Sequence, residues 1–255
     1  MVLRRLRRGL FWLSRSRPMG WLVRLAFARF WWLLPVRRVA ETSTLLAFEH
    51  PAPSWQPHIL LVPKRSVKSL VAARPADAVL VGQIVRLAFG VAASRRLDTA
   101  GFALLVNGGA YQDVPQLHFH LAGLDAGLRY ELPTDQIARM GSHSPLARST
   151  HLAAYPHPRP QREVHLVMLL DRPQTWRDLA GPDGERIGVE LVSVSQILVT
   201  HLALGAPGGE PGVGPGFTLL ASVRPGRLDD PVCFHLVAGR RAIEADTPTP
   251  GTKPG

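Results

Sequence analysis

Cysteine, acid near the N-terminus and an unbroken apolar run of membrane length are all scarce in this sequence. Cys233 is the only cysteine among 255 residues, so an internal disulfide and a structural zinc site built from thiolates are excluded. The longest apolar stretch, from Trp21 to Val36, is interrupted by Arg24 and Arg29, which disfavours a helix that spans a bilayer. No small-residue cleavage site follows it, so a secretory signal is also disfavoured, and we expect a cytoplasmic protein.

Residues 1–40 contain no acid and account for nearly all of the net charge of +11. Ten arginines lie in this segment, whereas the rest of the chain is nearly neutral. The arginines are mixed with tryptophan, phenylalanine and leucine, a combination that favours a helix lying on an anionic membrane surface. The alternative is a helix that packs its tryptophans against the body of the protein. Nucleic acid is the least favoured partner, because the positive charge does not extend into the body.

A repeated pattern divides the rest of the chain into two parts. Residues 44–61 align without a gap with residues 151–168, and this alignment matches His50 with His157 and His58 with His165. Further on, Gly101-Phe-Ala-Leu-Leu matches Gly216-Phe-Thr-Leu-Leu, and at the same offset His118-Phe-His120 falls on Cys233-Phe-His235. Two matching blocks in the same order indicate an internal duplication, which constrains the architecture.

Each part is expected to contain two strands, a helix and two further strands. In the first part the expected strands are 44–49, 58–63, 103–107 and 116–122. Apolar residues at helical spacing predict helices within 78–92 and 187–204. This order predicts an α+β protein in which each part forms an antiparallel meander packed on its helix.

The expected organisation has five segments. They are a basic, aromatic-rich helical segment (1–40), a first domain (41–125), a linker (126–148), a second domain (149–242) and a disordered tail (243–255).

The chemistry concentrates in the strand expected at 116–122. Alternate residues of a strand point to the same face, so Gln116, His118 and His120 share one face there. Two imidazoles about 7 Å apart at this spacing can contact one phosphate, one as nucleophile and the other as hydrogen-bond donor. Structural or surface histidines are the alternative interpretation. A metal site is less favoured still, because no carboxylate or third histidine lies close in sequence.

The first part resembles the histidine triad (HIT) nucleotide hydrolases and transferases, whose signature alternates three histidines with hydrophobic residues. The resemblance covers roughly residues 44–123 and extends more weakly to 150–239. The matching motifs, in the family's order, are Ala47-Phe48, Pro53, His58-Ile-Leu-Leu-Val-Pro-Lys64, the helix around Gln83, Gly101-Phe102, Val106-Asn107 and Gln112-Asp-Val-Pro-Gln-Leu-His-Phe-His120.

By this resemblance His118 is the nucleophile, which attacks an α-phosphate and forms a nucleotidyl-histidine that water or another acceptor resolves. His120, His58 and Asn107 would contact the phosphate. Three positions depart from the family pattern: Gln116 replaces the first histidine of the triad, His50 an aspartate that grips the ribose, and Asp113 a serine near the leaving group. The candidate site therefore contains His118 as catalytic residue and, as residues that bind phosphate or nucleotide, His120, His58, Asn107, Gln116, Gln112, Asp113 and His50.

The second part retains His157, His165 and His235 but has Cys233 at the nucleophile position and Ser222 at the asparagine position. A cysteine between Val232 and Phe234 is more often a small buried apolar residue than a nucleophile, so we expect this site to be degenerate. Because members of the family commonly pair as two-fold dimers, the duplication implies an intramolecular pseudo-dimer that is monomeric or assembles further. The expected partner is a nucleotide substrate, with no cofactor and no metal. The alternative function is a noncatalytic module that binds or senses nucleotides.

Overall fold

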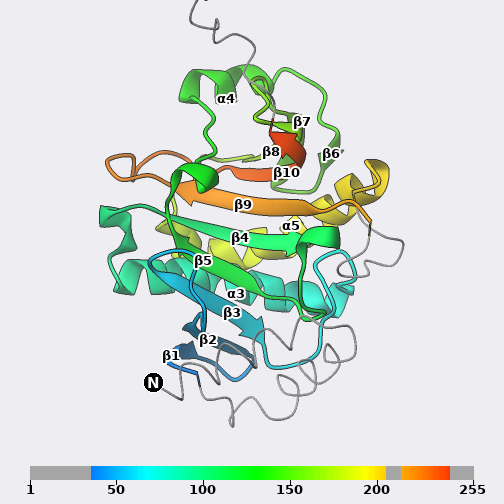
Figure 1. Ribbon diagram of the computed structural model, residues 1–255. Helices are drawn as coiled ribbons and strands as arrows, with labels where there is room; N and C mark the ends of the chain where they lie inside the picture. The colour runs from blue at the N-terminus through cyan, green and yellow to red at the C-terminus, as the bar shows by residue number, and fades with distance from the viewer. Residues whose placement is uncertain (1–35, 205–213, 242–255) are drawn as a thin grey trace, which may run out of the picture.

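The computed structural model describes residues 36–204 and 214–241. Most of the predicted basic segment, the predicted disordered tail and most of the glycine-rich loop around 205–214 lie outside these residues. One ten-stranded sheet contains every described strand, in the order β1-β2-β3-β5-β4-β9-β10-β8-β7-β6, and every neighbouring pair is antiparallel (Figure 1).

The first half of the chain forms one half of this sheet. Its strands are β1 (Arg38–Glu41), β2 (Leu45–Glu49), β3 (His58–Pro63), β4 (Phe102–Gly108) and β5 (Phe119–Gly123), and its helix is α3 (Pro75–Ser94). Pro75 lies in the first turn of α3, where a missing backbone N–H costs nothing, and the Asp77 carboxylate accepts a hydrogen bond from the backbone N–H of Arg74 at 2.9 Å. By length and hydropathy α3 could span a membrane, but most of it is buried inside the protein, as expected of a core helix.

The second half repeats this order of elements. A short helix, α4 (Thr134–Met140), precedes β6 (Ala147–Arg148), β7 (Leu152–Pro156), β8 (Arg162–Leu170), α5 (Pro182–His201), β9 (Phe217–Val223) and β10 (Phe234–Arg241). Single 3₁₀ turns lie at Leu97–Thr99, Gly109–Tyr111, Ala126–Leu128 and Asp178–Ala180. The predicted succession of two strands, a helix and two strands is therefore confirmed in both halves.

Two predicted boundaries are wrong. Residues 38–40, predicted as the end of a helical segment, belong to β1, which pairs with β2 at the edge of the sheet. The segment 126–148, predicted as a linker, contains α4 and the edge strand β6. Short edge strands of four and two residues carry too little periodicity to stand out in the sequence.

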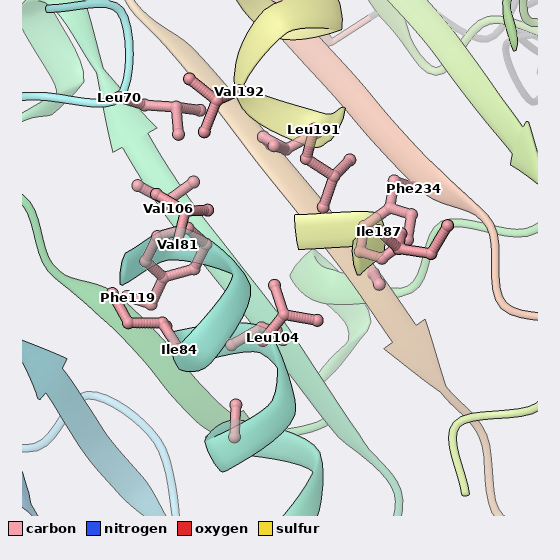
Figure 2. Packing of buried hydrophobic residues seen from close by; sticks show 14 of the residues in the cluster. Leu70, Val81, Ile84, Leu104, Val106, Phe119, Ile187, Leu191, Val192 and Phe234 are labelled. Atoms are coloured by element: carbon pink, nitrogen blue, oxygen red, sulfur yellow. The ribbon is translucent and has the colours of Figure 1, made fainter. Parts of the chain in front are cut away.

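The two long helices lie side by side on one face of the sheet and share one hydrophobic core with it (Figure 1). Side chains from both halves meet there, including Ile84 of α3, Leu104 of β4, Leu191 of α5 and Phe234 of β10 (Figure 2). The helices approach closely at Gly188, where an added Cβ would lie 2.6 Å from the Cα of Gly82. Any side chain at Gly188 would push the helices apart, so this contact needs glycine.

The opposite face of the sheet, the histidine face, carries His58, His120, His165 and His235. Leu60 of β3 and Leu105 of β4 lie on either side of His120 of β5 by strand register. Leu220 and Val237 continue this face on β9 and β10, where they join a small hydrophobic cluster with Leu105.

Candidate active site

His118 directly precedes β5, and the centroids of its ring and that of His120 are 4.9 Å apart. Leu105 pairs with His120, so the next position of β4 on the same face, Asn107, comes beside His118. The strand itself begins at Phe119 rather than at Gln116 as predicted. The structure thus brings His118 and His120 together, and the observed strand is shorter than the sequence pattern indicated.

One hydrogen bond sets the proton position on His118. Its Nδ1 lies 2.7 Å from the backbone carbonyl oxygen of Gln116, and because a carbonyl can only accept, Nδ1 must carry the proton. Burial lowers the pKa of His118 below its usual value, although the hydrogen bond to Gln116 and the Asp113 carboxylate oppose this shift. The ring is therefore neutral near pH 7 and has its lone pair on Nε2, the form in which an imidazole is a nucleophile.

A chain of hydrogen bonds fixes the protons of the next two histidines. The backbone N–H of Ser54 donates to Nδ1 of His58 at 3.2 Å, so the proton of His58 is on Nε2. That Nε2 lies 2.9 Å from Nδ1 of His120, which must accept, and the proton of His120 is therefore on its Nε2. Burial lowers the pKa of His58 to about 3 and that of His120 well below its usual value, so both rings are neutral. The site thus combines a lone pair on His118 with an N–H on His120.

His50 and Trp55 surround His58. The His50 ring stacks on that of His58 with centroids 4.1 Å apart, and its Nδ1 accepts a hydrogen bond from the N–H of Ala52. The Trp55 ring meets His58 edge-on at 4.8 Å, and its Nε1 donates to Asp125 at 2.8 Å. Trp55 was not among the predicted site residues, although an aromatic residue three positions before His58 was a usable signal.

Two glutamines predicted to bind nucleotide are turned away from the histidines. The side-chain amide of Gln116 donates to the backbone carbonyls of Pro63 and Arg65, and that of Gln112 to those of Lys68 and Val114. Both side chains are buried, at 1% and 2% exposure, so they attach the loop before β5 to the loop after β3. The expectation that Gln116 shares a face with the two histidines is wrong, because these carbonyls draw its side chain into the interior.

Asp113 is exposed, and its negative charge partly offsets the lowering of the His118 pKa by burial. Asn107 is half-buried, and its Oδ1 accepts a hydrogen bond from the Thr218 hydroxyl at 2.7 Å. Asn107 also lines a cavity of about 250 Å³ on the histidine face, whose walls include residues of both halves.

A second histidine cluster lies in the other half of the sheet with nearly the same geometry. Nε2 of His165 is 3.0 Å from Nδ1 of His235, and His157 stacks on His165 with centroids 4.0 Å apart. The backbone N–H of Gln161 donates to Nδ1 of His165 at 3.1 Å. Burial lowers the pKa of His165 to about 3 and that of His235 well below its usual value.

The segment between the halves covers this second cluster. The Tyr130 ring packs against those of His165 and His235, at 5.3 and 5.8 Å. The Glu131 carbonyl lies 2.9 Å from Nε2 of His157, and the Leu128 carbonyl accepts a short hydrogen bond from the Ser222 hydroxyl. The space left beside Cys233 and His235 is about 40 Å³. Burial raises the pKa of the Cys233 thiol to about 12, so this sulfur is protonated and a poor nucleophile at neutral pH.

The second cluster also resembles a metal site, because one ligand atom from each of His157, His165 and His235 lies within 4.8 Å of the others. Its ring nitrogens already make hydrogen bonds. Nδ1 of His157 accepts from the N–H of Arg159, its Nε2 donates to Glu131, and His165 bonds at both nitrogens. A metal would have to displace these bonds, so the arrangement fits hydrogen-bonded core histidines better than a ligand set.

Comparisons with known proteins place the first half of the chain in a family. The HIT domain model matches residues 34–127. An uncharacterized HIT-like protein of Synechocystis sp. is 37% identical over 92 residues, which cover 35% of this chain and 80% of that protein.

Solved structures resemble the fold over nearly the whole chain. An ADP-glucose phosphorylase from Arabidopsis thaliana with bound ADP-glucose has a TM-score of 0.60 at 10% identity, covering 86% of this chain and 82% of that one. A GalT-like protein from the same plant has a TM-score of 0.59 at 10% identity, covering 85% and 82%. At this identity the likeness concerns the fold, whereas the sequence match over the first half identifies the family. This chain belongs to the HIT family.

Proposed function

We propose that this protein is a nucleotidyl hydrolase or transferase that works through a nucleotidyl-histidine on His118. The observation that carries the proposal is the hydrogen bond from Nδ1 of His118 to the Gln116 carbonyl, because it leaves a lone pair on Nε2 of a neutral ring.

In the first step Nε2 of His118 attacks the α-phosphorus of a nucleoside phosphate ester, anhydride or phosphoramidate. A P–N bond forms while the bond to the leaving group breaks, and the leaving group departs with the electron pair, taking a proton from solvent where it leaves as an alcohol or an amine. In the second step water or another acceptor attacks the same phosphorus and gives up a proton to solvent, and the P–N bond breaks to return His118 to its neutral form.

The neighbouring polar groups would stabilise the charge that develops on the phosphoryl oxygens. The Nε2–H of His120 is available as a donor because its Nδ1 accepts from His58. Thr218 donates to Oδ1 of Asn107, which leaves the amide nitrogen of Asn107 as a donor. Fixed donors of this kind typically contribute about 10²–10³-fold to a rate. His50 and His58 would lie on the nucleoside side, as the family resemblance implies.

We also propose that residues 41–125 and 149–242 are two copies related by an internal two-fold axis. Sequence repetition matches Leu105 with Leu220, and these two residues are direct partners in the β4–β9 ladder. Asn107 pairs with Thr218, and Ala103 pairs with Ser222. Because Ala103 matches Thr218 and Asn107 matches Ser222 in the repeat, each pair is the two-fold image of the other, as in an isologous dimer interface.

The test compares the two nucleophile positions. With a nucleoside phosphoramidate or a dinucleoside polyphosphate as substrate, we expect His118→Ala to lower kcat at least about a thousandfold, by analogy with other covalent nucleophiles. The matched variant Cys233→Ala should change kcat less than about twofold, because a protonated thiol takes no part.

Intact-protein mass spectrometry after rapid acid-free quenching should detect one covalent nucleotide on the wild type and none on His118→Ala. Tight nucleotide binding without turnover in the wild type would overturn the enzymatic proposal and support a noncatalytic nucleotide-binding module. Membrane association through residues 1–40 stays a prediction, because residues 1–35 lie outside the described part of the chain.

A further inference from the structure

We propose that the central cavity on the histidine face is a subsite for a negatively charged group on the leaving side of the scissile phosphorus, with Arg162 as its anion-binding residue. This proposal rests on the nucleotidyl transfer proposed for His118. It narrows the substrate class to nucleotides whose leaving group is itself anionic, as in a phosphoanhydride.

The position of the cavity follows from the strand order. β5 carries His120 and follows His118, β3 lies on one side of β5, and β4 and β9 lie on the other. His58 is on β3, so a nucleoside bound near it leaves the opposite side for the rest of the substrate. There a cavity of about 250 Å³ is lined by Asn107, which follows Leu105 on the face of β4 that pairs with His120, and by Thr218 and Leu220. This volume suits a ligand group rather than a single water.

Arg162 lines the far side of this cavity. A bulge with Gly239 at a φ of +77° interrupts the pairing of β8 with β10 beside it, and bulges of this kind redirect neighbouring side chains. The half-buried Arg162 side chain donates from Nε to the Tyr130 hydroxyl at 3.1 Å. Within residues 36–204 and 214–241 it makes no salt bridge.

Arg224, the other half-buried arginine among the residues whose exposure the structure describes, is neutralised. Arg224 forms ion pairs with Glu131 at 2.7 Å and with Asp230 at 3.2 Å. A guanidinium stays charged at all ordinary pH values and offers five donors in a planar fork, of which Arg162 uses one here. A permanent charge without a carboxylate partner, lining a cavity that is also lined by Asn107, is an arrangement that binds phosphate.

The internal sequence repeat gives a second reason to assign Arg162 to this cavity. The alignment that matches His58 with His165 also matches Trp55 with Arg162, and both side chains line the cavity. The two halves thus place different groups at related positions around one space, an aromatic ring from the first half and a cation from the second. A leaving group would therefore contact the half that has lost the nucleophile.

The kinetic experiment compares two substrates with the same nucleoside and α-phosphate. Adenosine 5′-phosphoramidate releases ammonia, which carries no negative charge, whereas diadenosine tetraphosphate releases ATP, which is a polyanion. For Arg162→Gln we expect kcat/KM to fall about 10- to 100-fold on the tetraphosphate, which is the range for a lost charged hydrogen bond, and less than about threefold on the phosphoramidate. Arg162→Lys should recover part of the loss. The control Arg148→Gln, an exposed arginine on the edge strand β6, should change neither. Equal losses on both substrates, or none on either, would overturn the proposal.

A binding experiment separates failure of the subsite from failure of the catalytic proposal. Calorimetry with AMP and with the α,β-methylene analogue of ADP needs no turnover. The analogue should bind the wild type at least about tenfold more tightly than AMP, and Arg162→Gln should abolish that difference. Equal affinity of the two ligands for the wild type would overturn the subsite whatever the activity. A difference that depends on Arg162 in a protein without turnover would support the subsite and overturn only the catalytic step.

Discussion

The two histidine clusters share the same arrangement of hydrogen-bonded and stacked rings and differ in the residues that surround it. In both, a backbone N–H fixes the first imidazole, that imidazole bonds the second at 2.9 or 3.0 Å, and a third ring stacks on the first at about 4 Å. Only the first cluster has a fourth histidine, His118, whereas the second has Cys233 and a covering segment that includes Tyr130. The trio of two hydrogen-bonded rings and one stacked ring is therefore a structural unit of the sheet, and it is kept in the second cluster although no histidine stands at the position of His118.

Replacing the second imidazole of each trio, that of His120 or that of His235, tests whether the two clusters differ in function. His120→Ala deletes the proposed phosphate donor, and we expect kcat to fall about 100-fold or more. His235→Ala deletes a ring that contacts only protein, so kcat should change less than about threefold. Both rings are buried, so both variants should lose thermal stability to a similar degree. A comparable loss of kcat in the two variants would show that the second cluster takes part in the chemistry.

Substitutions at Tyr130 test how firmly the covering segment packs on the second cluster. This side chain is buried and packs on both histidines and on the small cluster with Leu128 and Val237, so Tyr130→Ala should lower the free energy of unfolding by about 3 kcal/mol. Tyr130→Phe keeps the ring and loses only the hydroxyl contact to Arg162, and it should cost about 1 kcal/mol or less. Chemical denaturation of both variants measures this difference. A loss below about 1 kcal/mol for Tyr130→Ala would mean that the segment lies loosely on the second cluster.

The smallest expected effect is on the pH dependence of the free energy of unfolding, and here the two clusters should behave alike. The pKa of His58 and that of His165 are both lowered to about 3 in the folded protein from 6.5. Between these values the unfolded chain binds protons that the folded protein does not, so the free energy of unfolding decreases as pH falls from about 6.5 towards 3. His58→Gln and His165→Gln should each reduce the proton uptake on unfolding by up to one proton in this window. Calorimetric unfolding at several pH values checks this, and an unequal reduction would show that the two environments differ.

Much of the fold followed from the sequence because it depends on periodic patterns. The buried helix around Ile84 is long and has apolar residues at helical spacing, and the strand around Leu60 is a short apolar run between two prolines. The family resemblance brought His50, His58, His118 and Asn107 into one prediction, and the structure stacks His50 on His58 and connects His58 through His120 to His118.

The remaining features depend on contacts between segments that are distant in sequence. Gln116 continues the alternation of β5, but the backbone carbonyls of Pro63 and Arg65, some fifty residues earlier, draw its amide inward. Arg162 and Tyr130 meet only because the segment after β5 crosses the histidine face towards the second half. Such contacts have no local signature, so no reading of the strand pattern alone would have found them.

The β4–β9 ladder has an evolutionary consequence. When two identical subunits meet along such a seam, a change in one gene product appears on both sides at once, so an active and a silent subunit cannot be encoded separately. Here a single polypeptide supplies both sides through seven consecutive residue pairs, from Phe102–Val223 to Gly108–Phe217. Each side is therefore free to acquire its own substitutions, and every molecule carries the asymmetric combination in a fixed one-to-one ratio.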